Sequence, residues 1–109
     1  MAAHTAMCTY RVKPGMEEAF EGHLKRHWPT LDKAGLVTKK RSEVFRGRED
    51  AGGVFYVELL EWKDAKAPDE AHHLPDVMAV WEPMGMCVED RDGRPGMEFP
   101  HVERLDLGG

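Results

Sequence analysis

The sequence has little of three things: long apolar runs, cysteine and excess positive charge. No stretch approaches the roughly 18–20 apolar residues that a membrane-spanning helix needs, and residues 1–12 hold no apolar signal-peptide core and no lipidation motif. The two cysteines, Cys8 and Cys87, lie far apart and form no C-x-x-C pair, which argues against a disulfide scaffold or a zinc ribbon. With 15 Lys and Arg against 20 Asp and Glu, the net charge is −5, which argues against nucleic acid as the main partner. We therefore expect a cytoplasmic protein with no membrane partner and no nucleic-acid partner.

The common catalytic signatures are also missing. The sequence contains no G-x-S-x-G nucleophile elbow, no P-loop, no dinucleotide-binding fingerprint and no internal repeat. Its 109 residues suit one domain, which we expect to span residues 1–109. A chain of this size buries roughly two-thirds of its unfolded surface, so pairing with a second subunit would add stability.

Hydrophobic periodicity predicts alternating strands and helices. Residues 5–13 alternate between two faces, as in a strand, whereas apolar residues in 16–34 recur every three or four positions, as on one face of a helix. Pro68 and Pro75 each suit the first turn of a helix, which indicates a helix broken into two pieces. In chain order, the predicted elements are a strand at 5–13, a helix at 16–34, strands at 36–46 and 54–62, helical pieces at 68–73 and 75–82, and a strand at 99–105.

This order, β-α-β-β-α-β, is typical of the ferredoxin-like fold. The predicted fold class is α+β, with a four-stranded antiparallel sheet that carries helices on one face. Pro29 lies inside the first predicted helix, where we expect a kink or a local break. Pro83 and Gly85 should end the last helical piece.

The segment 54–62 (VFYVELLEW) is the strongest predicted strand, and it is apolar on both sides. Phe55, Val57 and Leu59 point one way, and the alternate positions, all apolar except Glu58, point the other. The helices of a short chain can cover only one of these faces. We therefore expect the other face to pack against an identical subunit in a homodimer.

Three segments together resemble a known family. They are the strand and turn TYRVKPG (9–15), the strand end YVELLEWKD (56–64) and the broken-helix stretch AHHLPDVMAVW (71–81). Over residues 5–107 the chain resembles the dimeric α+β barrel superfamily and, within it, the antibiotic-biosynthesis-monooxygenase-type domains. The resemblance implies two sheets that close a barrel across a dimer, with a ligand cavity between each subunit's sheet and its helices. Some members oxygenate phenolic, polyketide-like substrates without metal or flavin, whereas others degrade haem, isomerise lactones or have no known activity.

The resemblance also bears on single residues. Cofactor-free oxygenases of this family use a Trp at the end of the third strand, and Trp62 matches it. Where they carry an amide residue and a Tyr, this chain has Glu58 and Pro68. In the haem-degrading branch a His on the second helix binds iron and an Asn lies on the first strand, and this chain has Glu82 and Cys8 at those places. The resemblance thus supplies one of the three oxygenase groups and neither haem-branch residue.

Two histidines and a glutamate are the candidate catalytic residues. His72 and His73 lie in the broken helix, beneath the implied cavity, and neutral His is the commonest general base near pH 7. Adjacent helical residues diverge by about 100°, so at most one should face the cavity, and otherwise both are structural or surface residues. Glu58, if it points inward, should have a raised pKa and could move a proton, whereas outward it would pair with a Lys or Arg.

Large side chains are the candidate walls of a ligand site. Trp62 and Trp81 could be plain core or could flank a flat aromatic ligand, and Met78 suits a cavity that takes apolar ligands. His27 lies on the flank of the first predicted helix that borders the core, so it could line the cavity. His23 and His27 also have the i, i+4 spacing of a metal pair, but no third ligand is evident, and we predict no metal site.

Two classes of function follow from these patterns. The first is a cofactor-independent monooxygenase, or an isomerase, acting on a small, flat, aromatic or polyketide-like compound. It would use His72 or His73 as the base and Trp62 to position the substrate. The second is a non-catalytic domain of the same fold that binds a small hydrophobic ligand or serves as an accessory subunit. Haem binding through His72 or His73 is a third hypothesis.

Overall fold

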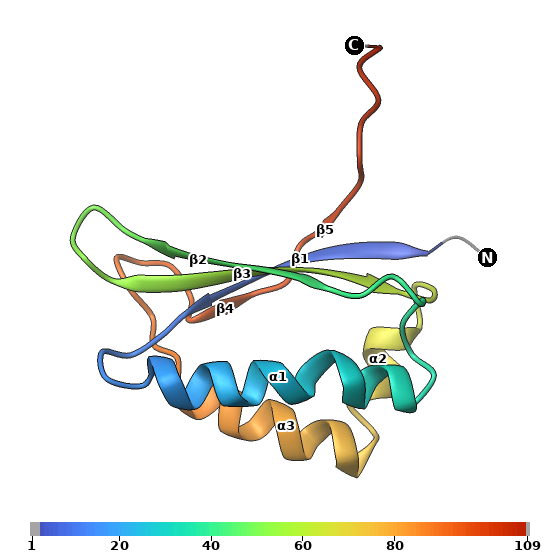
Figure 1. Cartoon of the computed structure of the whole chain (residues 1–109), viewed down its shortest axis with the longest axis horizontal. Coiled ribbons are helices and arrows are strands. Elements are labelled where there is room, and N and C mark those ends of the chain that lie inside the picture. The colour runs from blue at the N-terminus through green and yellow to red at the C-terminus, as the bar shows by residue number, and fades with distance from the viewer. Residues whose placement is uncertain (1–2, 109) are drawn as a thin grey trace.

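The computed structural model describes residues 3–108 and places strands and helices in the predicted order (Figure 1). The elements are the strand β1 (His4–Arg11), the helix α1 (Glu17–Lys33), the strands β2 (Glu43–Arg48) and β3 (Val54–Trp62), the helices α2 (Ala67–Ala71) and α3 (Pro75–Met86), and the short strands β4 (Met97–Glu98) and β5 (His101–Val102).

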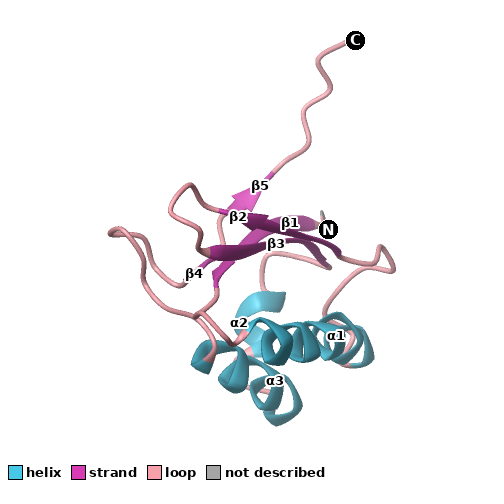
Figure 2. Cartoon of the chain, turned by 60° about the vertical axis from the view of Figure 1, so that its left-hand side comes forward, coloured by secondary structure: helices cyan, strands magenta, loops and turns pink. Residues whose placement is uncertain are grey.

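The strands form one antiparallel sheet in the order β2-β3-β1-β4, with β5 also paired to β1. β1 and β3 lie side by side at its centre, and Cys8 is opposite Glu58 in their register. The helices α1, α2 and α3 lie on one side of this sheet, as Figure 2 shows, and none of the helices in the described part of the chain is long and apolar enough to cross a membrane. This is the predicted ferredoxin-like arrangement, with the last strand divided into β4 and β5.

The core lies between the inner face of the sheet and the helices. In β3 every second residue is buried and the residues between are partly exposed, so the predicted alternation of this strand is confirmed. Phe20 and Leu31 of α1 and Met84 of α3 pack in the same hydrophobic core. Burial of apolar surface, at about 25 cal/mol per Å², is the main stabilising contribution. Glu58 is the one charged residue on the inner face of β3.

The helix α1 runs unbroken through Pro29. The expected break does not occur, because the helix buries Phe20, His27 and Leu31 along one face and this packing holds the helical path. Pro29 lies on the exposed side, where water can satisfy the carbonyl that loses its helical partner. The proline therefore removes a hydrogen bond without ending the helix.

The helix α3 also continues past the residues expected to end it. The last helical piece should stop at Pro83 and Gly85, but α3 ends only at Met86, about one turn later. Val80 and Met84, on either side of Pro83, are both buried. Burial of this face therefore outweighs the missing hydrogen bond, and the prediction was wrong at this end.

The predicted strand at 36–46 is shorter than expected, since β2 begins at Glu43. The preceding segment still lies beside the end of β3. Lys63 N donates to Leu36 O at 3.0 Å, and Thr38 N donates to Glu61 O at 3.1 Å. These bonds tie the end of α1 to the sheet without forming a continuous ladder.

The predicted strand at 99–105 is replaced by two short strands, β4 and β5, on either side of Pro100. Pro100 has no N–H to donate to a ladder. Its carbonyl still accepts from Met7 N at 2.9 Å, so the segment stays beside β1. The prediction of a final antiparallel strand in this region is thus correct, but the strand is not continuous.

The sheet face opposite the helices is open and partly apolar. Met7, Phe45 and Val102 belong to this face and are 37%, 55% and 38% exposed. Phe55, Val57 and Leu59 of β3 are only partly buried. In Figure 2 the C-terminal residues extend away from the sheet on this same side.

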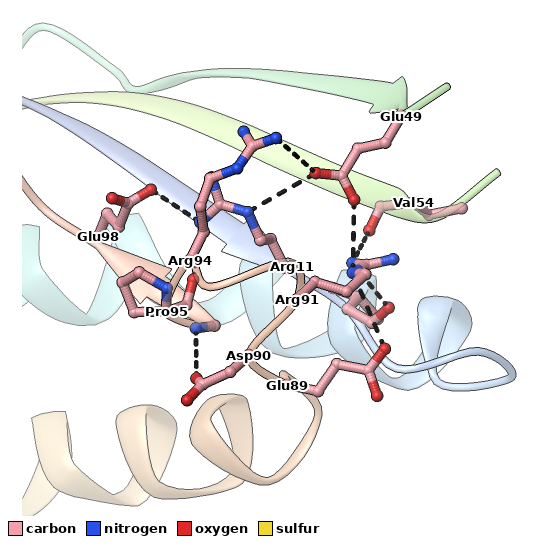
Figure 3. A network of polar contacts seen from close by, with 11 residues as sticks. Arg11, Glu49, Val54, Glu89, Asp90, Arg91, Arg94, Pro95 and Glu98 are labelled. Atoms are coloured by element: carbon pink, nitrogen blue, oxygen red, sulfur yellow. Dashed lines mark hydrogen bonds and ion pairs between the residues drawn. The ribbon is translucent and has the colours of Figure 1, made fainter. Parts of the chain in front are cut away.

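A polar network joins the end of β1 to the loop that precedes β4 (Figure 3). Arg11 Nη1 donates to Pro95 O and to Glu98 Oε1, both at 2.7 Å. The carboxylate of Glu49 lies 3.7 Å from Arg11 Nε and 3.4 Å from Arg91 Nε. The network fixes the loop against the sheet and so sets the position of β4, which forms part of the cavity described next.

Candidate functional site

A cavity of about 380 Å³ lies between the inner face of the sheet and the helices. This volume is within the range of sites that hold small molecules. Its walls are mostly apolar and include aromatic rings, and its polar side chains come from five elements or loops: Tyr10, His27, His72, Glu82 and His101. The cavity lies where the family resemblance implies a ligand site.

His27 stands at the centre of a buried chain of hydrogen bonds. Trp81 Nε1 donates to His27 Nε2 at 2.9 Å, and His27 Nδ1 lies 2.9 Å from Glu58 Oε1. Tyr10 donates its hydroxyl to the same oxygen at 2.8 Å. The four side chains come from α3, α1, β3 and β1. These hydrogen bonds can therefore form only when the helices have docked against the sheet.

The hydrogen bonds fix the tautomer of His27. The indole N–H of Trp81 can only donate, so His27 Nε2 accepts and carries no proton. The ring is therefore neutral, with its proton on Nδ1, and this N–H donates to the Glu58 carboxylate. A carboxylate that orients an imidazole in this way leaves Nε2 as the basic atom.

Glu58 points inward, but its pKa is lowered, so the expected rise was wrong. Burial raises the pKa of Glu58, but the hydrogen bond and the electrostatic attraction of His27, then the hydrogen bond of Tyr10 and a smaller effect of Ser42, together lower it by more. Its second oxygen, Oε2, is buried and has no hydrogen-bond partner within residues 3–108. Glu58 is not among the described residues that line the cavity, so it reaches the cavity through His27 and Tyr10.

Tyr10 and Cys8 line the cavity beside this chain. Burial, followed by the charge of Glu58, raises the pKa of Tyr10 well above its usual value. The same two causes raise the pKa of the Cys8 thiol to about 12. At neutral pH both groups are protonated, so neither supplies an anionic nucleophile to the cavity.

The two histidines of the broken helix differ in their relation to the cavity. Both are exposed. His72 reaches the cavity, where its ring meets that of Trp81 edge-on with centroids 4.8 Å apart. His73 is not among the described lining residues. The structure thus places one of these two candidate bases at the cavity, on its exposed rim.

The structure brings the predicted wall residues together. Trp62, Trp81, His27 and Met78 all line the cavity. The two indole rings meet edge-on with centroids 6.5 Å apart. Whether these residues bind a ligand stays a prediction.

The sequence did not single out Tyr10, and it suggested His27 only as a wall residue or as half of a metal pair. A signal for the pairing was present. Glu58 is a single charge on the inner face of an apolar strand, and a buried charge needs donors. His27 lies seven residues, about two helical turns, after the apolar Phe20, so the two share the buried face of α1. A buried carboxylate that faces a helix with a buried histidine predicts this hydrogen bond.

The spacing of His23 and His27 does not produce a metal pair. His27 turns toward Glu58, whereas His23 Nδ1 accepts from Arg26 at 2.5 Å. Across the described positions, no group of three or more His, Cys, Asp or Glu side chains is arranged to hold a metal ion.

Comparisons with known proteins give matches in structure and none in sequence. No family model matches the chain, and no curated protein matches it. A candidate antibiotic biosynthesis monooxygenase from Nitrosomonas europaea superposes with a TM-score of 0.71 at 10% identity, covering 98% of this chain and 94% of the other. A mutant of SnoaB, a cofactor-independent oxygenase from Streptomyces nogalater, gives 0.68 at 15% identity over the whole of both chains.

A third structure, Rv0793 from Mycobacterium tuberculosis, gives a TM-score of 0.67 at 11% identity and covers 99% of this chain and all of that one. At identities this low, the likeness establishes the fold. The chain has the fold of the antibiotic-biosynthesis-monooxygenase-type domains.

Proposed function

We propose that this chain is a cofactor-independent monooxygenase that acts on a small aromatic or polyketide-like compound bound between the sheet and the helices. The observation that carries the proposal is the buried pair of His27 and Glu58, which places an unprotonated ring nitrogen at the wall of a mostly apolar cavity. A phenol or enol would lie against Trp62 and Trp81, with its acidic hydroxyl toward a histidine.

The reaction needs a base and a dry pocket. Removal of the hydroxyl proton leaves an electron-rich anion, and this anion supplies electrons to O₂. When a ring CH₂ becomes a carbonyl, one atom of O₂ enters the product and the other leaves as water with the two hydrogens of the CH₂ group. The substrate supplies all the electrons, so the protein needs to supply only the base, the orientation and the exclusion of water.

Two further observations support this class of reaction. SnoaB, which shares the fold, is described as a cofactor-independent oxygenase. Trp62 occupies the place that the family resemblance gives to the oxygenase Trp, and it lines the cavity. The structural likenesses support the class of reaction and leave the substrate to be found.

Oxygen uptake tests the proposal. The protein, treated with EDTA, is mixed under air with a panel of phenols and enolisable diketones, and O₂ consumption is followed with an electrode. We expect protein-dependent uptake with at least one compound, and one labelled oxygen atom in the product when labelled O₂ is supplied. His73→Gln is the matched control, because this residue lies outside the cavity lining. It should keep full activity.

The second candidate is a non-catalytic small-molecule-binding or accessory domain. One observation favours this candidate. Trp81 donates its N–H to His27 Nε2, so the only unprotonated nitrogen of the ring already has a hydrogen-bond partner. Saturable binding of a panel compound without O₂ uptake would support this candidate and contradict the oxygenase. A product of unchanged mass, formed without O₂ uptake, would indicate an isomerase.

We also propose that two copies of the chain pair through the open face of the sheet. Met7, Phe45 and Val102 expose apolar surface there, and apolar surface of this kind is stabilised by contact with another molecule. A second copy would present the same residues around a two-fold axis. Such a dimer would cover the outer face of β3, as the sequence predicts.

A further inference from the structure

We propose that Trp81 is a displaceable cap on His27, that the acidic hydroxyl of a ligand replaces the Trp81 N–H at Nε2, and that His27 takes the proton of this hydroxyl. The inference rests on the proposed function for its choice of ligand, a phenol or an enol. It assigns the base to His27, which the sequence placed only in the wall of the cavity, and it makes an acidic hydroxyl the feature by which the cavity selects its ligand.

The geometry leaves one atom of His27 for this purpose. Nδ1 is held by Glu58, so Nε2 is the nitrogen whose partner can change. That partner is the indole N–H of Trp81, 2.9 Å away, and both His27 and Trp81 line the cavity. A ligand hydroxyl at the same place would meet an acceptor that is already desolvated and already aimed.

The two ends of the hydrogen-bond chain differ in their freedom to move. Tyr10 and Glu58 are fully buried within the sheet. Trp81, in contrast, is partly exposed. One part of its indole packs against the core, and its ring meets those of His72 and Trp62 edge-on at centroid distances of 4.8 and 6.5 Å. The indole can therefore move toward solvent while His27 stays in place. Its N–H would exchange one acceptor for water, which costs little.

The proton transfer balances within the site. The proton leaves the ligand oxygen and binds His27 Nε2, and the Nδ1–H bond to Glu58 stays intact. The resulting imidazolium then lies between two anionic oxygens, one on Glu58 and one on the ligand, and both of its N–H groups are paired. Glu58 is the positioning residue in this step, because it does not line the cavity.

Within the described residues, Cys8, Tyr10, His72, Glu82 and His101 are the titratable groups that line the cavity together with His27. Glu58 of β3 contacts His27 directly, and Tyr10 of β1 binds the same carboxylate oxygen. On the far side of Trp81 lies His72, at the end of α2. His72 is the competing base, and it differs from His27 in being exposed to water. The experiment must therefore separate these two histidines.

A chromogenic phenol gives the required signal. 4-Nitrophenol is titrated with the full chain at a pH where the free phenol is mostly neutral, and the phenolate absorbance is measured per bound ligand. We expect binding to increase the phenolate fraction in the wild type. His27→Gln should abolish this increase, and Glu58→Gln should reduce it and shift its pH profile. His72→Gln should retain it even if affinity changes.

The cap has a test of its own. Trp81→Phe keeps an aromatic wall but removes the competing donor, so 4-nitrophenol should bind about two- to tenfold tighter, the equivalent of one released hydrogen bond. The matched ligand is 4-nitroanisole, which has no acidic hydroxyl. It should gain no affinity from Trp81→Phe. This comparison remains informative even if His27→Gln fails to fold.

The outcomes that would overturn the inference are distinct from those that bear on the oxygenase. A phenolate signal that survives His27→Gln, a signal lost in His72→Gln, no binding of 4-nitrophenol at millimolar concentration, or equal effects of Trp81→Phe on both ligands would each contradict it. A phenolate signal with no O₂ uptake from any phenol would keep the inference and remove the oxygenase. O₂ uptake that persists in His27→Gln would contradict the inference and keep the oxygenase.

Discussion

Glu58 carries a negative charge at a place with almost no water. Its side chain is 1% exposed, and an unpaired carboxylate there would be very costly. Tyr10 and His27 both donate to its Oε1, and these bonds make the buried charge tolerable. The same bonds hold the imidazole in one tautomer, so the requirements of stability and of the site coincide in these three residues.

We expect Glu58→Gln to destabilise the fold at neutral pH by about 1–3 kcal/mol. Two hydrogen bonds lose their charged acceptor, and an amide N–H₂ enters a buried place without a partner. Because the pKa of Glu58 is lowered in the folded protein, its charge stabilises the fold above the ordinary glutamate value of 4.5 and ceases to do so as pH falls through the folded pKa. The difference from wild type should therefore shrink below about pH 4.5, as measured by urea unfolding.

Glu61→Gln is the matched control for this change. Glu61 belongs to the same strand but to its outer face, where it is partly exposed and accepts from Thr38 at 2.7 Å. A charge with access to water contributes less to stability. Equal losses in the two variants, or a Glu58→Gln loss that does not change in acid, would contradict the assigned charge state.

The two thiols should be unreactive in the folded protein. Burial raises the pKa of Cys8 to about 12 and also raises that of Cys87, and only the thiolate reacts rapidly with disulfide reagents. At pH 8 a thiol-reactive chromogenic disulfide should label neither residue within minutes. Both should react after addition of guanidinium chloride. Rapid labelling of the native protein would show that the cavity beside Cys8 is open to the reagent and that its thiol ionises.

Among the elements, β4 depends most on charged contacts. It is two residues long, and the loop before it is mainly polar. Arg11, whose side chain is 5% exposed, binds Pro95 of that loop and Glu98 of β4 itself, and it lies 3.7 Å from Glu49. Arg11 itself is shielded from water, whereas Glu98 is 39% and Glu49 is 16% exposed. Removal of Arg11 therefore leaves partly hydrated carboxylates and costs less than the loss of one partner of a fully buried ion pair.

We expect Arg11→Met to lower the free energy of unfolding by roughly 1–2 kcal/mol, mainly through the lost hydrogen bonds to Pro95 and Glu98, and to speed hydrogen exchange of the amides in 97–102. Urea unfolding and native-state exchange measure the two effects. Arg46→Met is the control, since the Arg46–Glu21 pair is exposed on both sides and should contribute little. Unchanged exchange in 97–102 would show that the network does not hold β4.

At the scale of the whole molecule, the open sheet face predicts pairing. Val57 lies in the middle of this face, on the central strand β3, opposite Phe45 in the register. We expect the wild type to sediment as a dimer at micromolar concentration and Val57→Lys to shift it toward the monomer, because a buried ammonium opposes contact. Met86, at the end of α3, is 71% exposed, and Met86→Lys should leave the dimer intact. A folded wild-type monomer would contradict the proposed pairing.

Much of this molecule could be predicted from local patterns. Strand 54–62 was predicted with its correct bounds, and the two-residue alternation put Glu58 on one face with apolar residues but left open whether that face points inward, which the structure shows. Two predictions were wrong, namely that the last helix stops at Pro83 and that a strand covers 36–46. In both cases tertiary packing overrode a local propensity, since Met84 is buried beyond the proline and residues 36–38 pair with β3 without a regular ladder.

By itself the sequence determined the order of elements and the two alternating faces of the strands at 5–13 and 54–62, because periodicity and side-chain polarity act over a few neighbouring residues. The tertiary structure alone decided which side chains meet. Tyr10, His27, Glu58 and Trp81 come from four elements spread along the chain. Their contact depends on strand register and on how α1 and α3 dock against the sheet. No local stretch of residues determines either of these.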